Sequence, residues 1–400
     1  MSFLQSLAAA FKGVPGPERP PLARSFASPW LVADLRGGDA RGPFNYTAAV
    51  RAAYLRNPVA QRAVRLVAEG VGGAPLCAGD ASLLALVTAT SAGQSLLETL
   101  ASHLLLHGNA WVQILRDGLG RPVELFALRP ERVTVICDTA GWPAAFGYQV
   151  AAQQLTIPAL DEFGRANVVH VRDFHPSDDQ YGAGCLVAAE EAVAIHNAAA
   201  VWNRSLLENA ARPSGALVYD PGEPGAALTN DQFERLRSEL DTTFAGPMQA
   251  GRPMLLDGGL KWQSMALSPA DMDFATLKAA AARDIALAFG VPPMILGLPG
   301  DSTYNNYREA NRALWRQTIL PLAAKLLAAL CEGLVDTFHG AELRVDLDKV
   351  PALADDRAAL WTQISQAAFL SPGEKRALLG LELPLAAAAV GDDEAAEIEP

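Results

Sequence analysis

The sequence contains six histidines and four cysteines, the residue types that most often bind zinc. His103 and His107 are four residues apart on a predicted helix, a spacing that can hold a metal ion. Neither histidine belongs to an H-E-x-x-H sequence, and no third ligand is evident. We therefore interpret both as partly buried structural histidines.

Three pairs of acidic residues have the composition of an acid–base or metal site. They are Asp178 with Asp179, Asp271 with Asp273, and Asp355 with Asp356. All of them fall in predicted loops or at helix starts, where carboxylates favour the helix dipole. We interpret the three pairs as structural, and no Ser, His and Asp set stands out as a catalytic triad.

The segment GAGCLVA (182–188) imitates the G-x-G-x-x-A sequence of a dinucleotide site. Such a site requires a strand directly before the glycines, whereas the preceding FHPSDDQY is typical of a loop. A turn at the start of a helix is the better interpretation, and no G-x-x-x-x-G-K-[ST] sequence occurs. The sequence thus predicts no catalytic residues, no metal and no cofactor, and we expect a protein that is not an enzyme.

Three arginines share one face of a predicted helix. Arg308, Arg312 and Arg316 follow a polar and aromatic loop in GLPGDSTYNNYREANRALWRQ (297–317), and residues four apart lie on the same helix face. The favoured interpretation is a solvated or intersubunit salt-bridge face. The alternative is a stripe that faces phosphate.

Composition limits the possible classes of protein. The 400 residues carry a formal net charge of -12, with 50% hydrophobic and 19% charged residues. This charge argues against a surface that grips nucleic acid throughout, since such binders neutralise phosphates with Lys and Arg, but it permits a local contact. The four cysteines are widely spaced, so neither a zinc knuckle nor a disulfide framework is expected. No run of about 18 apolar residues predicts a membrane span, and the start, MSFLQSLAAAFKG, is typical of an amphipathic segment rather than a signal peptide.

The first half of the chain predicts an extended arm, two helices and a sheet. Residues 13–45 are rich in Pro, Gly and Arg, which is typical of an extended lead-in. The first helix has Pro58 in its first turn and ends at Gly70 with Gly72; in the second, Ser95 and Glu98 form a capping box. Alternating segments then predict an antiparallel meander with strands near 109–116, 123–129, 132–138 and 146–150, ending near 167–174.

The middle of the chain predicts a helical hairpin with a small domain at its tip. The two alanine-rich helices, 188–211 and 269–289, bracket a β-α-β-β module. Thr229 and Gln232 have capping-box spacing before the helix of that module. Small side chains suit helices that are packed on several sides, and one hairpin supplies too few neighbours. Self-association into a ring or bundle follows as a hypothesis.

The last part predicts a kinked helix, a returning strand and two short helices. The helix of about 304–338 contains Pro321, which removes a backbone hydrogen bond and should kink it. The strand AELRVDLDKV and two helices broken at SPG follow, and the acidic last ten residues are expected to be disordered.

Several of these stretches together resemble the portal proteins of tailed double-stranded DNA phages and related gene transfer agents. The resemblance covers about residues 45–383 and depends on the order and spacing of short motifs. These include NPVAQRAVRLVAEGVGGAPL, LLLHGNAWVQILRD with LRPERVTV, YGAGCLVAAEEAVAIHNAAAVWNRSLLENAARPSGAL, AGRPMLLDGGLKWQSMALSPADMDF, DIALAFGVPPMILG, STYNNYREANR and LSPGEKRALLGL.

The resemblance implies an α+β portal fold, in which a wing with an antiparallel sheet and helices, a helical stem, an α/β clip and a helical crown form a ring. The implied parts are an N-terminal arm (1–45), the wing (46–187), a stem helix (188–212), the clip (213–267), a second stem helix (268–291), the tunnel loop, kinked helix and wing return strand (292–350), the crown (351–385) and an acidic tail (386–400).

The implied function is a ring of usually twelve subunits at one capsid vertex of a virion or phage-like particle, assembled in the cytoplasm of a bacterial host. Double-stranded DNA would enter and leave through its channel, and the ring would nucleate capsid assembly. Implied partners are other copies of the chain, the DNA, the terminase large subunit, the major capsid protein and a head-tail adaptor, with no membrane. The alternatives are a head-tail adaptor or minor capsid protein and, more remotely, a nucleotide- or metal-dependent enzyme.

The resemblance also assigns residues to parts of the ring. The tunnel loop would comprise Asp301, Ser302, Thr303, Tyr304, Asn305 and Asn306. Docking of the adaptor or terminase on the clip is expected at Asp220, Glu223, Arg235, Arg237, Lys261 and Trp262.

Overall fold

The computed structural model describes residues 45–208, 215–219, 229–244, 260–264, 274–298 and 304–380. The predicted N-terminal arm and acidic tail lie outside these residues. The chain divides into two compact units, each described by itself. The first contains Tyr46, Val67–Cys185 and the chain from Trp315, and the second contains Thr47–Leu66 and Leu186–Leu314.

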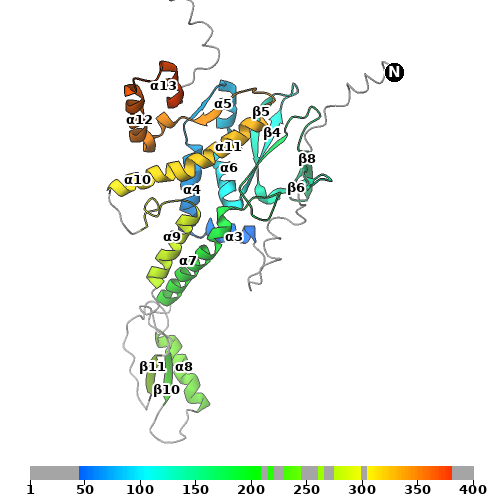
Figure 1. The fold of residues 1–400 in the computed structure, drawn as a ribbon. Coiled ribbons are helices and arrows are strands. Elements are labelled where there is room, and N and C mark those ends of the chain that lie inside the picture. Colours follow the sequence, from blue (N-terminus) through cyan, green and yellow to red (C-terminus); the bar gives the residue numbers. More distant parts are fainter. Residues whose placement is uncertain are drawn as a thin grey trace, which may run out of the picture. The chain divides into compact units, whose positions relative to one another are not determined.

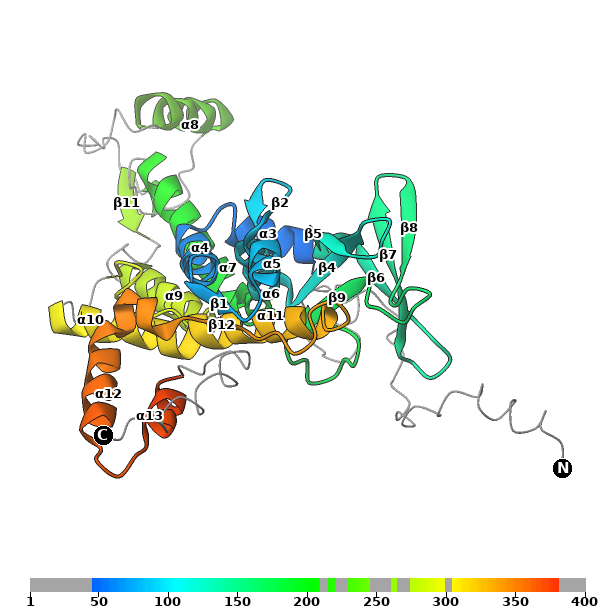
Figure 2. The same cartoon turned by 90° about the horizontal axis from the view of Figure 1, so that it is seen from above.

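The first unit contains two separate three-stranded sheets (Figures 1 and 2), besides two short strand pairs. In one, β4 (Asn109–Arg116) lies between β5 (Pro122–Leu128) and β9 (Val168–Arg172). In the other, β7 (Pro143–Val150) lies between β6 (Val133–Cys137) and β8 (Gln153–Pro158). The predicted single meander is therefore wrong, because the 3-10 turn η1 (Pro130–Arg132) separates β6 from β5 and β9 returns to pair with β4. All neighbouring strands are antiparallel, as predicted.

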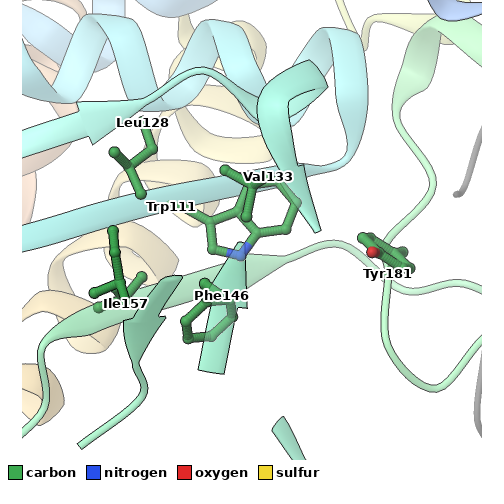
Figure 3. Packing of buried hydrophobic residues seen from close by; sticks show 7 residues of the cluster. Trp111, Leu128, Val133, Phe146, Ile157 and Tyr181 are labelled. Carbon is green, nitrogen blue, oxygen red and sulfur yellow. The ribbon is translucent and has the colours of Figure 1, made fainter. Parts of the chain in front are cut away.

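One hydrophobic cluster joins the two sheets (Figure 3). Trp111 of β4 is fully buried, and its ring stacks on His170 of β9 with centroids 4.5 Å apart. Phe146 and Ile157 contribute from the second sheet, and Tyr181 packs edge-on against Trp111. Aromatic side chains each bury a large apolar area, so these rings stabilise the junction.

Helices cover the first sheet. α6 (Leu96–His107) contacts β4 and β5, and α5 (Ala81–Thr88) lies beside it. The capping box predicted for Ser95 and Glu98 is absent: Ser95 precedes α6 without a side-chain cap, because it lies in the short strand β3 (Gln94–Ser95) paired with β2 (Thr90–Ser91). α6 ends at Gly108, whose left-handed backbone (φ +79°) suits glycine.

α4 (Pro58–Gly72) begins at a proline, as predicted, and Asn57 caps it through backbone amides of Val59 and Ala60. The helix ends at Gly72, as predicted, but it continues through Gly70, which was predicted to end it together with Gly72. A Cβ at Gly70 would lie 2.5 Å from Cδ1 of Ile319, so this glycine permits close packing rather than termination. A preceding short helix, α3, spans Tyr46–Ala53.

A π-helical turn interrupts the long helix near its proline. α10 (Tyr304–Leu314) continues into the π turn η3 (Trp315–Ile319) and then α11 (Leu320–Gly333). Pro321 lacks the amide for an α-helical bond, and the wider turn just before it lets the helix continue. The sequence predicted an irregular helix at Pro321, and the structure has this π turn directly before the proline.

The span Asn306–Gly333 is long and apolar enough to cross a membrane by composition (mean hydropathy 1.2), although the sequence predicted no such segment. α11 supplies buried Ala323, Leu326, Leu327 and Leu330 and packs against α6, β9 and β12. Packing in the core of the first unit accounts for the apolar composition of α11.

The predicted return strand is confirmed. β12 (Leu343–Val345) pairs antiparallel with β1 (Leu76–Ala78) near the start of the first unit. After the 3-10 turns η4 (Leu347–Lys349) and η5 (Pro351–Leu353) come the two predicted helices, α12 (Ala354–Gln366) and α13 (Pro372–Leu379). Ser371 and Glu374 form a capping box at α13.

The second unit contains the long helices α7 (Cys185–Glu208) and α9 (Phe274–Ala288), which lie side by side in Figures 1 and 2. α7 begins three residues before the predicted start, and both helices otherwise fall within the predicted spans. Asn57 donates to His196 (3.1 Å) and Asn197 (2.9 Å), and these bonds fix the start of α4 on α7.

The small module of this unit has the predicted order. β10 (Gly215–Tyr219) pairs antiparallel with β11 (Leu260–Ser264), and α8 (Asn230–Phe244) lies between them in sequence. The capping box of Thr229 and Gln232 is confirmed by bonds of 3.0 and 3.4 Å. The other predicted strand, near 251–259, lies outside the described residues.

Candidate functional site

The loop before α10 is shorter than predicted. Tyr304, Asn305 and Asn306 belong to the first turn of α10, while Asp301, Ser302 and Thr303 lie outside the described residues. Among the described residues, no cluster of metal-ligating side chains surrounds this turn. A role for the turn is therefore argued from its position in the chain.

The arginines that follow have different surroundings. Arg308 is exposed; Arg312 forms an ion pair with Glu309 of the same helix (3.1 Å). Arg316, in the π turn, forms an ion pair with Asp356 of α12 at 2.6 Å. Within one chain, Arg316 therefore helps to hold α12, whereas a contact of any of the three with DNA or a neighbouring subunit stays a prediction.

A second set of contacts holds the C-terminal helices to the rest of the first unit. Arg357 of α12 pairs with Asp348 (2.5 Å) and donates to the carbonyl of Leu379 (3.0 Å). Arg344 of β12 donates to the carbonyl of Gly380 (2.7 Å). The hydrogen bond from Arg357 lowers the pKa of Asp348 below its usual value. The two arginines thus fix α12 and α13 beside the return strand.

The residues predicted for docking on the clip are partly described. Arg235 and Arg237 are exposed on α8, and Lys261 is exposed on β11. Trp262 pairs with Leu217 in the ladder of β10 and β11. Asp220 and Glu223 lie outside the described residues, so the six are not brought together as one described surface.

The glycines of GAGCLVA serve backbone packing. Cβ atoms at Gly182 or Gly184 would collide with the backbone around Gly108, and α7 begins at Cys185. Asn109, fully buried, accepts a bond from the amide of Gly182 (2.8 Å) and donates to its carbonyl (3.0 Å). The turn before the helix, predicted from the sequence, is confirmed, and its glycines and Asn109 lock it onto β4.

The predicted histidine pair lies in the same buried region. Burial lowers the pKa of His103 to about 4 and that of His107 to about 3, since the charged imidazolium loses hydration. His170, which bonds Asn109 at 3.1 Å, has its pKa lowered to about 3 for the same reason. Among the residues that the structure describes, no group of three or more His, Cys, Asp or Glu side chains could hold a metal ion. The expected structural burial of the histidines is confirmed.

The predicted acidic pairs act in local structure where they are described. Asp178 accepts from the amides of Gln180 (2.7 Å) and Tyr181 (3.0 Å) and so shapes the turn before the glycines. Asp355 and Asp356 lie in the first turn of α12. Asp271 and Asp273 lie outside the described residues.

Three comparisons with known proteins agree with this architecture. The model of the phage portal protein family matches residues 58–380. A Rickettsia bellii protein is 37% identical over 345 residues, covering 82% of this chain and 88% of that protein. A probable portal protein of Streptomyces phage phiC31 is 26% identical and covers 68% of this chain and 60% of its own length.

Solved structures extend the match to three dimensions. The neck of a native gene transfer agent particle, computed with C12 symmetry, contains a chain that is 43% identical; the match covers 88% of this chain and 99% of that one, with a TM-score of 0.66. An HK97-family phage portal protein from Corynebacterium diphtheriae shares the fold at 18% identity and a TM-score of 0.55. The mixed helix-and-sheet architecture is thus that of phage portal structures. The chain belongs to the phage portal protein family, whose members are structural proteins.

Proposed function

We propose that this chain forms a portal ring of twelve subunits at one vertex of a phage-like particle and that double-stranded DNA enters and leaves through its channel. The observation that carries the proposal is the 43% identity, over 99% of its length, to a chain in the neck of a gene transfer agent particle computed with C12 symmetry. We therefore expect this ring in a gene transfer agent or a related phage particle.

In this proposal α7 and α9 are the stem, the module of β10, α8 and β11 is the clip, and α12 with α13 is the crown. The stem helices expose large apolar side chains, including Val201, Trp202, Leu277 and Leu287. Exposed apolar surface of this kind marks protein contacts. Neighbouring stems in a ring would cover it.

The charge of the chain suits a conduit. Each phosphate contact adds salt-sensitive affinity, so a wall rich in lysine and arginine would retain DNA. A chain of net charge -12 with few basic side chains allows a duplex to move. The loop at 299–303 and the first turn of α10 would contact it transiently, with Arg308 and Arg312 nearby on the helix.

The clip would dock the terminase large subunit during packaging and the head-tail adaptor afterwards, through Arg235, Arg237 and Lys261. Attachment to the major capsid protein would place the ring at the vertex where the shell begins to assemble. A family match across 58–380 favours this role over that of a head-tail adaptor. Nothing in the described residues favours an enzyme.

Electron microscopy of the purified protein along its symmetry axis tests the ring. We expect class averages with twelve-fold symmetry and a particle of about twelve times 42.3 kDa. A stable monomer at micromolar concentration would contradict the assembly.

Deletion of residues 301–303 tests the channel. We expect rings to assemble as in the wild type while the DNA content of particles falls severalfold. A matched deletion in the acidic tail, 393–395, should leave the DNA content unchanged. Normal DNA yield after the first deletion would exclude a role of this loop in DNA passage.

A further inference from the structure

The sheet β6–β7–β8 has one edge closed by a side chain, whereas no described strand pairs with its other edge. At the β6 edge, the amide of Val135 donates to the hydroxyl of Tyr181 at 3.0 Å. At the β8 edge, no hydrogen bond is found beyond β7 for Gln154 or Thr156 among the residues that the structure describes. Open strand edges invite pairing with another strand.

The ladder fixes which groups of β8 point outward. The amide of Ala159 donates to the carbonyl of Ala144 at 2.9 Å, next to the register pair Ala145 and Pro158. In antiparallel pairs, hydrogen-bonded and non-bonded positions alternate. Leu155 therefore bonds β7, while the amide and carbonyl groups of Gln154 and Thr156 point away from the sheet.

Exposed apolar side chains lie on β8 and at the end of the neighbouring strand β7. Leu155 is 55% exposed and Val150 is 45% exposed, although the pleat places both on the face that buries Phe146 and Ile157. The strand Gln153–Pro158 contains no charged residue. Natural edge strands are commonly protected by charge, so this edge is suited to a covering strand.

We propose that residues 30–35 of the N-terminal arm, WLVADL, pair with the β8 edge of their own chain as a fourth strand. The arm joins the described structure beside this sheet, because the ring of Tyr46 packs edge-on against His107 (4.7 Å) and the ring of His107 packs edge-on against Trp111 (6.0 Å). Trp111 lies in the cluster that includes Phe146 of β7 and Ile157 of β8.

Distance and composition both permit the pairing. β8 lies two strand spacings from β6, about 10 Å, and residues 30 to 45 can span up to about 50 Å when extended. Trp30 and Val32 have high strand propensity and follow Pro29, which is tolerated at the start of a strand. They share one face of a strand, where they extend the apolar surface of Leu155. The inference does not depend on the portal role.

Hydrogen exchange of the assembled protein tests the added strand. We expect the amides of Gln154 and Thr156 to exchange at least tenfold more slowly in the full chain than in the double variant Trp30→Asp, Val32→Asp. The amide of Phe146, inside the ladder, should be equally protected in both. The matched control Phe3→Asp, Leu4→Asp places the same charges elsewhere in the arm and should keep the β8 amides protected. Equal exchange of Gln154 and Thr156 in the full chain and the Trp30, Val32 variant would overturn the proposal.

A cysteine pair tests which chain supplies the strand. Val32→Cys with Leu155→Cys, oxidised with copper phenanthroline, should give a crosslinked product that runs as a monomer on a denaturing gel without reductant. A ladder of linked dimers would show that the strand comes from a neighbouring subunit and would overturn the assignment to the same chain. A third variant, Thr156→Pro, removes the outward amide and should reduce the crosslink severalfold; an undiminished yield would also contradict edge pairing.

Discussion

Replacement of Asn109 by alanine should destabilise the first unit more than the loss of so few side-chain atoms suggests. The side-chain oxygen accepts from the amide of Gly182 and from His170, and the side-chain nitrogen donates to the carbonyls of Gly182 (3.0 Å) and His107 (3.3 Å). Asn109 is fully buried, so water cannot replace these bonds. A buried polar group that loses its partner costs about 1–3 kcal/mol.

The magnitude follows from the groups left behind. The amide of Gly182 and the imidazole of His170 each lose their acceptor. Together these losses should lower the free energy of unfolding by about 2–5 kcal/mol. For a unit of this size, 1 kcal/mol shifts the melting temperature by about 2–4 °C. The variant should therefore melt roughly 5–15 °C below the wild type.

Thermal denaturation followed by intrinsic tryptophan fluorescence measures this change, since Trp111 lies in the same core. Asn167→Ala is a matched control, because its amide bonds the carbonyl of Pro158 at the surface, and it should shift the melting temperature by less than about 2 °C. A shift this small for Asn109→Ala, with unchanged hydrogen exchange at Gly182, would refute the locking role.

Three further outcomes follow from the described contacts. Gly70→Ala should lower the free energy of unfolding by about 1–3 kcal/mol through overpacking. Adding Ile319→Val removes the Cδ1 atom that lies 2.5 Å from the new Cβ and should restore much of this free energy. Chemical denaturation of the four proteins of this double-mutant cycle measures both effects. Arg316→Asp should break the ion pair with Asp356 (2.6 Å) and speed proteolysis near α12. The double variant Arg316→Asp, Asp356→Arg restores the pair with the charges exchanged and should restore protection from proteolysis. Unrestored protection would assign Arg316 to another partner. Burial lowers the pKa of His103 to about 4 and the pKa values of His107 and His170 to about 3, below the 6.5 of the unfolded chain. The stability that these neutral histidines contribute is therefore complete above pH 6.5 and is lost as the pH falls toward 3. The loss is up to about 1.4 kcal/mol per pH unit for each group. Urea denaturation between pH 7 and 4 checks this, and His170→Gln should flatten the slope.

Elements with a strong apolar period, or with clear turn residues at their ends, could be predicted closely. β4 was predicted at its observed residues, because Gly108 and the turn at Asp117 mark its two ends. The capping box at Thr229 was also predicted, since both of its bonds are local. The box at Ser95 had the same spacing and failed, because pairing of β2 with β3 gave Ser95 an extended role. Local spacing cannot reveal a competing nonlocal partner.

The division into two sheets was missed for a related reason. β9 follows β8 in sequence but pairs with β4, and strand partners are set by packing around Trp111 rather than by order along the chain. β8 itself was missed because QQLTIP has only two large apolar residues, and one of them, Leu155, is exposed. Of the candidate site, the arginine spacing was visible, whereas the partner of Arg316 lies 40 residues away.

The glycine motif explains why a nucleotide site and a packing motif look alike in sequence. Both require backbone atoms to approach where a Cβ would collide: in a nucleotide site the neighbour is pyrophosphate, and here it is the backbone at Gly108. The two kinds of motif differ in the group that accepts a hydrogen bond from the glycine amide. Asn109 accepts from the amide of Gly182, so this amide is already bonded and is not available to a phosphate. The order H-G-N at 107–109, followed by G-A-G at 182–184, therefore encodes a joint between β4 and the turn at 182–184.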